Sequence, residues 1–207
     1  MYEQLKAATR EYYEGSLAKF GDDPRGVNWR DGETQRLRFA VLCGVGDFTG
    51  RRVHDVGCGL AHLTDFLRDE KIACDYVGSD ISPAMIQQAR RRAPGATLEV
   101  ADILGGPSAP WMAADYLVTS GLFHVRGAQS PDEWRAFVQA MVLRMFELAG
   151  RGIAFNMMTS YVDYEDAHLY YSPPTEMLDF CVRHLGRRVV VRHDYPLWEY
   201  TVYAYKS

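Results

Sequence analysis

The sequence predicts an α/β fold in which a doubly wound, mostly parallel sheet carries helices on both faces. Residues 53–59 read Val-His-Asp-Val-Gly-Cys-Gly, which is typical of a buried strand that ends in a glycine turn before a helix. A second apolar run ends at Asp80, 21 residues after Gly59 (80 − 59). Further apolar runs alternate with helical patterns, as in successive β-α-β units.

The N-terminal residues 1–48 are predicted to form a helical cap ahead of the sheet. Apolar residues recur at helical spacing over residues 2–17, and a turn-rich segment follows at residues 21–26. A second helix is expected over residues 33–45. Its predicted apolar face consists of Leu37, Ala40, Val41 and Val45.

Four helices are expected within the core, residues 51–207. The first follows the glycine turn, with Leu60, Leu63, Phe66 and Leu67 facing inward. Ser82 and Ser130 each precede a proline, which indicates an N-cap followed by the first helical residue. The helix after Ser130 is expected to run to about Ala149, with Gly150 and Gly152 at its exit. The last helix opens at residues 172–174 and stops at Gly186.

Seven strands are predicted. Five of them, near residues 53–56, 76–80, 98–103, 115–119 and 153–157, alternate with helices and should be parallel. The last two, residues 188–193 and 200–205, are joined by a short turn and should pair antiparallel.

Length, composition and net charge limit the classes of function that the chain can have. A chain of 207 residues with 47% apolar and 24% charged residues suits one globular domain. Its net charge of −4 argues against a nucleic-acid partner, since such proteins usually carry a basic surface. No apolar run approaches membrane-spanning length, and the N-terminus lacks a signal-peptide core. Four scattered cysteines indicate reduced thiols and a cytoplasmic protein.

The glycine spacing distinguishes between nucleotide ligands. A dinucleotide fingerprint reads G-x-G-x-x-G, but His62 stands at the third glycine position after Gly57 and Gly59. Asp55 lies within the turn, where it would repel a pyrophosphate and support an ammonium group. The turn therefore favours a nucleoside that carries an amino-acid tail.

These residues resemble motif I of the class I (Rossmann-like) S-adenosylmethionine-dependent methyltransferases. Residues 76–82, 98–103 and 115–121 are similar to the family's second, third and fourth strands, although Ala61 replaces a frequent glycine. The resemblance implies the strand order 3-2-1-4-5-7-6. It also implies that Asp80 holds the ribose hydroxyls and that Asp102 accepts from the adenine amino group. The expected cofactor-binding set is Trp29, Arg38, Asp55, Gly57, Cys58, Gly59, Asp80, Ile81, Asp102, Ile103 and Ser120.

Several of these assignments have a structural alternative. Asp80 and Asp102 could be ordinary strand-end acids, and Asp55 could only support the glycine turn. Arg38 would suit the methionine carboxylate of the cofactor, because a guanidinium forms two parallel hydrogen bonds with a carboxylate. Arg38 could equally lie on a solvated face of its helix. Trp29 would form a wall of the crevice or simply pack in the core.

Two residues are candidates for catalysis. His124 follows the fourth strand, where a general base would be useful, but a structural histidine is the alternative. Tyr161 begins an aromatic and acidic stretch within a predicted lid near residues 157–173. Tyrosines and acids there would suit a cationic or amine acceptor, or they could anchor a solvated loop. No metal site is predicted, since the six histidines lack paired spacing with other ligands.

The sequence thus predicts an enzyme that uses S-adenosylmethionine, yields S-adenosylhomocysteine, and methylates an oxygen or nitrogen of a small molecule without a metal. A methyltransferase acting on RNA or protein is one alternative. A non-catalytic subunit that only binds the cofactor is another. A monomer or a homodimer is expected, with no membrane partner.

Overall fold

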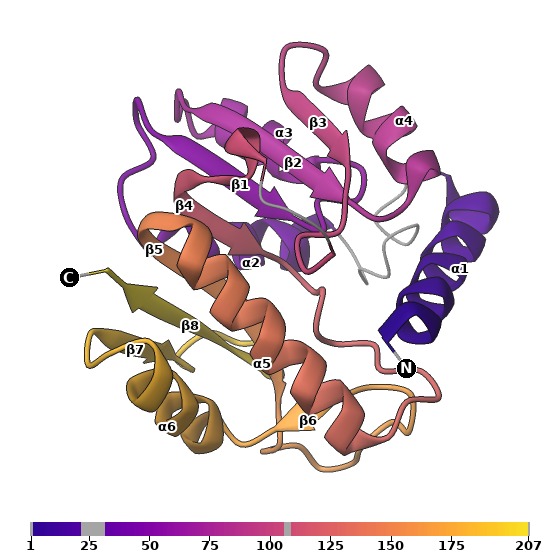
Figure 1. The fold of residues 1–207 in the computed structure, drawn as a ribbon, viewed down its shortest axis with the longest axis vertical. Helices are drawn as coiled ribbons and strands as arrows, with labels where there is room; N and C mark the ends of the chain where they lie inside the picture. The colour runs from indigo at the N-terminus through magenta and orange to yellow at the C-terminus, as the bar shows by residue number, and fades with distance from the viewer. Residues whose placement is uncertain (1, 22–31, 106–108, 207) are drawn as a thin grey trace.

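One sheet organises the part of the chain that the structure, a computed structural model, describes: residues 2–21, 32–105 and 109–206. Its order is β3-β2-β1-β4-β5-β8-β7, with β6 paired to β5 (Figure 1). The strands are β1 (Arg52–Val56), β2 (Asp75–Asp80), β3 (Thr97–Val100), β4 (Ala114–Thr119), β5 (Ala149–Thr159), β6 (Tyr171–Ser172), β7 (Val189–Arg192) and β8 (Glu199–Tyr205). Only β8 pairs antiparallel, with β5 and β7. The predicted order is confirmed, with β7 and β8 as the sixth and seventh strands; the two-residue β6 is additional.

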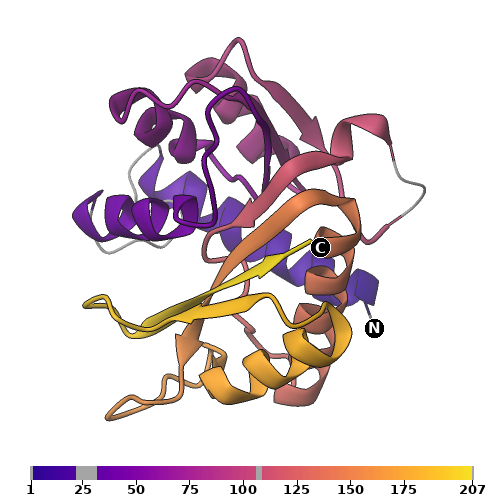
Figure 2. The same ribbon diagram turned by 90° about the vertical axis from the view of Figure 1, so that its left-hand side faces the viewer.

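Helices cover both faces of this sheet, as predicted (Figure 2). They are α1 (Tyr2–Phe20), α2 (Gly32–Cys43), α3 (His62–Asp69), α4 (Pro83–Arg92), α5 (Pro131–Leu148) and α6 (Pro174–His184), with a 3₁₀ turn at Pro110–Met112. Apolar side chains of α2, α3 and α4 form one core with the sheet, and those of α5 and α6 form another. The helix α1 lies to one side, near the carboxyl ends of β1 and β2 (Figure 1).

Two helix starts follow the predicted capping chemistry. The Ser82 hydroxyl accepts a hydrogen bond from the Met85 amide at 3.2 Å. At α5, the Ser130 hydroxyl accepts from the Glu133 amide, while the Glu133 carboxylate accepts from the Ser130 amide, which completes a capping box. These bonds satisfy amide groups that the first turn of a helix leaves unpaired.

We expect Ser130→Ala to destabilise the protein by about 1 kcal/mol, because the first turn of α5 would lose its cap. For a domain of this size, such a loss lowers the melting temperature by about 2–4 °C. Thermal unfolding followed by circular dichroism checks this. Ser130→Asn is the control, since asparagine also caps and should retain most of the stability. An unchanged melting temperature for the alanine variant would contradict the assignment.

Two details differ from the sequence expectation. The buried residues of α2 are Gln35, Phe39, Val41 and Leu42, whereas Ala40 is exposed, so the predicted apolar face of this helix was partly wrong. Gly150 and Gly152 do not separate α5 from the next strand but lie within β5. A Cβ at Gly152 would stand 2.9 Å from the Ala204 carbonyl oxygen, so glycine serves the close approach of β5 and β8 there.

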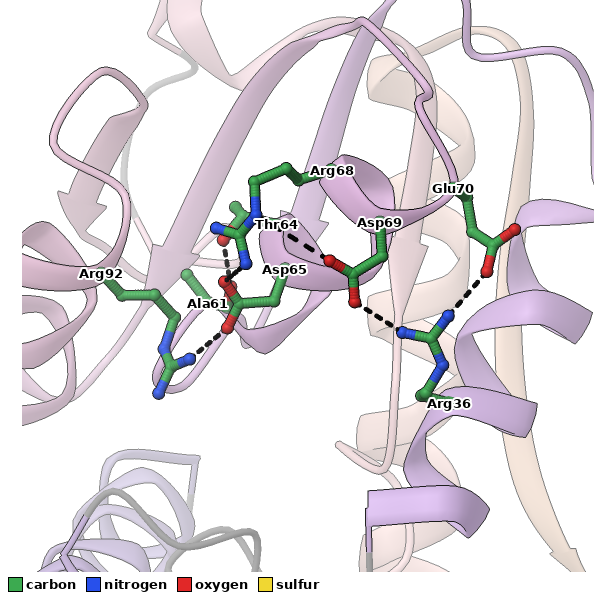
Figure 3. A network of polar contacts seen from close by, with 8 residues as sticks. All are labelled: Arg36, Ala61, Thr64, Asp65, Arg68, Asp69, Glu70 and Arg92. Carbon is green, nitrogen blue, oxygen red and sulfur yellow. Dashed lines mark hydrogen bonds and ion pairs between the residues drawn. The ribbon is translucent and has the colours of Figure 1, made fainter.

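Ion pairs on the surface join the three helices of the first core (Figure 3). Arg36 of α2 binds Asp69 and Glu70 at the end of α3, at 2.8 and 2.6 Å. Asp65 of α3 binds both Arg68 and Arg92, and Arg92 ends α4. Exposed pairs of this kind contribute about 0–1 kcal/mol each, so the apolar core rather than this network holds the helices to the sheet.

Candidate functional site

A cavity of about 1120 Å³, including its part open to solvent, lies at the carboxyl ends of the first four strands. Nine of the eleven predicted cofactor-binding residues line it: Asp55, Gly57, Cys58, Gly59, Asp80, Ile81, Asp102, Ile103 and Ser120. Segments that are far apart in the sequence therefore meet where ligands bind in open α/β sheets.

The glycine turn after β1 adopts the backbone conformation that its sequence predicts. Gly57 and Gly59 have φ values of +70° and +53°, in the left-handed region that favours glycine. A Cβ at Gly57 would come within 3.1 Å of Leu122 Cδ1. Ala61, which replaces a glycine frequent in the resembled family, also has a left-handed backbone, with φ of 58°. The position therefore requires the conformation that glycine adopts most easily, and alanine adopts it in this chain.

Backbone N–H groups hold both carboxylate oxygens of Asp80. Its Oδ2 accepts from the Gly59 amide at 3.0 Å, and its Oδ1 accepts from the Ser82 amide at 2.8 Å. Burial raises the pKa of this carboxyl, and the backbone N–H groups oppose that shift. A carboxylate has about four acceptor positions, so each oxygen retains one for a ligand hydroxyl.

Asp55 is buried in the cavity wall beneath the turn. Its Oδ2 accepts from the Tyr76 hydroxyl at 2.8 Å. Burial raises the pKa of Asp55 to about 7, against a smaller lowering by the Tyr76 hydrogen bond. The site therefore contains a carboxyl that ionises near neutral pH. A cation bound nearby would stabilise its charged form.

Asp102 makes contacts that the sequence did not predict. Its Oδ1 accepts from the Tyr2 hydroxyl at 2.6 Å and from the Leu104 amide at 2.9 Å, and its Oδ2 accepts from Lys6 Nζ at 3.2 Å. Tyr2 and Lys6 belong to α1, which thus closes one side of the cavity. A second contact holds this helix, because the Ser82 hydroxyl donates to Glu14 at 2.7 Å.

Arg38 does not line the cavity. Its Nε donates to Glu199 Oε2 at 2.9 Å, and Glu199 is 1% exposed. The other oxygen of Glu199 accepts from Asn156 Nδ2 at 3.2 Å, while Asn156 Oδ1 accepts from the Gly121 amide at 2.8 Å. Gly121 does line the cavity, so this buried chain of contacts fixes the backbone of the β4–α5 loop behind the site.

Neither predicted catalytic residue reaches the cavity wall in this structure. His124 is buried beside the network, with Nε2 3.8 Å from Glu199 Oε2. Burial, reinforced by Arg38, lowers the pKa of His124 to about 3, so its ring is neutral at physiological pH. Tyr161 is 62% exposed and stacks on His193, with ring centroids 6.0 Å apart. A catalytic role for either residue stays a prediction.

Trp29 lies outside the described residues. The predicted lid runs beside the β4–α5 loop, where the Tyr170 amide donates to the His124 carbonyl at 2.8 Å. In the part of the chain that the structure describes, no group of three or more His, Cys, Asp or Glu residues is placed to hold a metal ion. In the same part, no helix has the length and apolar character needed to cross a membrane.

Sequence reasoning missed the contribution of α1 and of Gln35 and His62 to the cavity. Tyr2, Lys6 and Arg10 recur on one face of α1, and all three line the site. Their spacing of four residues was the available signal, but the apolar pattern of the helix drew the interpretation towards packing. Gln35 Nε2 lies 3.2 Å from His62 Nδ1, which brings α2 to the start of α3.

The chain is similar in sequence to known methyltransferases. Residues 53–144 match the family model described as "Methyltransferase domain". Over 157 residues, the chain is 35% identical to "Putative methyltransferase Rv1506c" of Mycobacterium tuberculosis (strain ATCC 25618 / H37Rv); the alignment covers 75% of this chain and 93% of that protein.

Solved structures share the fold at low sequence identity. Magnesium protoporphyrin IX methyltransferase from Synechocystis PCC 6803, crystallised with S-adenosylmethionine, has a TM-score of 0.66 at 17% identity, covering 98% of this chain and 97% of that one. A Burkholderia thailandensis 1,6-didemethyltoxoflavin-N1-methyltransferase, solved with bound 1,6-didemethyltoxoflavin and S-adenosylhomocysteine, has a TM-score of 0.69 at 16% identity, covering 99% of this chain and 90% of that one.

Proposed function

Because the chain belongs to the class I S-adenosylmethionine-dependent methyltransferase family, we propose that it methylates an oxygen or nitrogen atom of a small molecule, without a metal ion. The observation that carries this proposal is the cavity at the carboxyl ends of the strands, in which the glycine turn, Asp55 and Asp80 face α1. The net charge of −4 favours a small molecule over RNA.

The residues present fit the cofactor. The two free acceptor positions of Asp80 suit the ribose hydroxyls, and the left-handed glycines let a ligand approach the backbone closely. Asp55 supplies a carboxyl for the ammonium group of the methionine tail. Asp102 has most of its acceptor positions filled by α1 and the Leu104 amide, so an adenine amino group would share or replace one of these contacts.

When bound, S-adenosylmethionine supplies a methyl group that is already activated by a positively charged sulfur. The protein then has to align the acceptor atom and exclude water, and such positioning can lower a barrier by up to about 7–11 kcal/mol. Ser120, Gly121 and Leu122 line the cavity after β4 and would form the wall beside the reacting atoms. Since neither His124 nor Tyr161 lines the cavity, alignment rather than a protein base is the main contribution that we propose.

The same proposal covers the organisation of the chain. Residues 1–207 would act as one domain, with a cap (1–48), a core (51–207) and a lid near 157–173. The scattered free cysteines, Cys43, Cys58, Cys74 and Cys181, favour a reducing compartment such as the cytoplasm. We propose a monomer or a homodimer.

Calorimetric titration with S-adenosylmethionine and S-adenosylhomocysteine tests the proposal, followed by methyl transfer from labelled cofactor to a panel of small molecules. We expect micromolar binding of both ligands and transfer to at least one acceptor. Absence of binding would overturn the proposal. Binding with transfer only to RNA or protein would favour that alternative, and binding without any transfer would favour a non-catalytic partner subunit.

Cofactor affinity should depend on pH through Asp55. Its pKa of about 7 means that the carboxyl is mostly protonated at pH 6 and mostly ionised at pH 7.5. Only the ionised form attracts an ammonium group, so the affinity for S-adenosylhomocysteine should rise by up to roughly tenfold over this interval. Calorimetry at several pH values measures it.

Two controls isolate this effect. The affinity for 5′-methylthioadenosine, which lacks the amino-acid tail, should stay nearly constant over the same pH range. The Asp55→Asn variant should bind S-adenosylhomocysteine without the rise. If both ligands show the same pH dependence with the wild type, Asp55 does not pair with the ammonium group.

A further inference from the structure

A second, smaller cavity of about 430 Å³, including its part open to solvent, lies between α1 and residues 125–129 of the β4–α5 loop. Leu5, Thr9 and Tyr13 line both this cavity and the larger one. The two spaces therefore adjoin along a single face of α1. A molecule in the second cavity would lie next to a ligand in the first.

The walls of this second cavity are mainly apolar and aromatic. Leu5, Ala8 and Val125 contribute aliphatic surface, and Tyr12 and Tyr13 meet edge to face with ring centroids 5.3 Å apart. Among the described residues that line it, none carries a carboxylate. A flat apolar ligand would gain both burial and ring contacts there.

The formal charge in the lining of this cavity comes from Arg126. Its Nε donates to the Leu169 carbonyl at 3.2 Å, and its Nη1 donates to the Gln129 carbonyl at 2.5 Å. Backbone carbonyls orient a guanidinium but do not neutralise it. Within residues 2–21, 32–105 and 109–206, no carboxylate pairs with Arg126, nor with Arg10 of the larger cavity. The second cavity thus offers positive charge next to aromatic surface.

We propose that the second cavity is the acceptor subsite and that the acceptor is an aromatic molecule carrying an anionic group, such as a carboxylate. This inference rests on the proposed methyl transfer and specifies its substrate class. The ring would lie against Tyr12, Tyr13 and Leu5, and the anionic group would meet Arg126, because guanidinium groups bind carboxylates through charge-assisted hydrogen bonds.

The acidic lid gives no support to a cationic acceptor. None of the acids that suggested an amine substrate, Asp163, Glu165 and Asp166, lines either cavity. Asp166 instead binds His168, with Oδ1 2.5 Å from Nδ1. Arg126 would repel an ammonium group in the second cavity.

Binding of an aromatic anion tests the inference without turnover. The probe is 8-anilinonaphthalene-1-sulfonate, titrated by fluorescence against the protein alone and against the protein saturated with S-adenosylhomocysteine. Ala8→Trp would fill the cavity and should weaken probe binding at least tenfold. Ala7→Trp is the matched control, because Ala7 is the neighbouring exposed residue of α1 and lines neither cavity. It should leave binding within twofold of the wild type.

A second variant tests the charge. Arg126→Gln should weaken the sulfonate probe about tenfold, since a hydrogen bond to a charged group is replaced by a neutral one. It should leave N-phenyl-1-naphthylamine, a neutral aromatic probe, unaffected. Equal effects of the two α1 variants, or tighter binding of an aromatic amine cation than of the anion, would overturn the inference. Failure of S-adenosylhomocysteine to bind would overturn the proposed function instead, and the probe titration of the protein alone would still report on the second cavity.

Discussion

Asp80→Ala is expected to lower the affinity for S-adenosylmethionine and S-adenosylhomocysteine by about 10²–10⁴-fold. The variant would remove two charge-assisted hydrogen bonds to the ribose, each contributing about 1.5–3 kcal/mol. It would also leave the amides of Gly59 and Ser82 without the carboxylate that they now share. Calorimetric titration of the purified variant measures the loss.

The same strand offers a control. Asp75 lies at the opposite end of β2, where it is exposed and pairs with Arg52 at 2.7 Å. Asp75→Ala should bind both ligands as the wild type does. Asp80→Asn should fall between the two, because its amide oxygen still accepts one hydrogen bond. Wild-type affinity for Asp80→Ala would show that the ribose lies elsewhere.

Local sequence chemistry, together with the family resemblance, predicted the fold and most of the strand-end residues that line the cavity. The alternation of apolar runs and helical patterns, a short-range signal, predicted the parallel α/β sheet, and the family resemblance implied its strand order. The positions of Gly57, Gly59 and Asp80 at the cavity could be predicted because they depend on backbone conformation and on place at a strand end, and the roles of these residues toward the cofactor stay predictions. Ser82 and Ser130 marked helix starts for the same reason.

Long-range polar pairing could not be predicted in this way. Arg38 and Glu199 are 161 residues apart, and Tyr2 and Asp102 are 100 residues apart. Nothing in either local pattern identifies the partner, so Arg38 was expected to face the cofactor, whereas it lies outside the cavity. The expected contact of Asp102 with the adenine stays a prediction. The wall formed by α1 was missed for a related reason. Leu5 is the residue of α1 that is buried in the core. Tyr2 and Glu14 of the same helix instead form hydrogen bonds with Asp102 and Ser82, which are distant in the sequence.

The Arg38–Glu199 pair explains why a charged residue at the start of β8 is buried. Burial raises the pKa of the Glu199 carboxyl, and Arg38 and Asn156 counter that shift by stabilising its charged form. Such buried pairs add little net stability by themselves, but breaking one leaves an uncompensated charge in the interior. Here the pair also supports, through Asn156, the Gly121 backbone at the cavity wall.

We therefore expect Glu199→Ala to destabilise the protein by about 3–5 kcal/mol, because Arg38 would lose the carboxylate that it binds. For a chain of this length, the melting temperature should fall by about 6–20 °C. Thermal and chemical unfolding measure both quantities. Asp194→Ala, which breaks the exposed pair with Arg192, is the matched control and should cost at most about 1 kcal/mol.

A double variant distinguishes the electrostatic cost of taking the Glu199 carboxylate away from Arg38 from the cost of lost packing. Arg38→Met combined with Glu199→Leu removes both charges and keeps apolar volume, so it should recover most of the stability lost in Glu199→Ala. Its Asn156 side chain would lack the Glu199 oxygen, and the Gly121 loop would be held less firmly. We expect this variant to fold but to bind S-adenosylhomocysteine more weakly than the wild type. If Glu199→Ala unfolds at the wild-type temperature, the buried network does not support this side of the site.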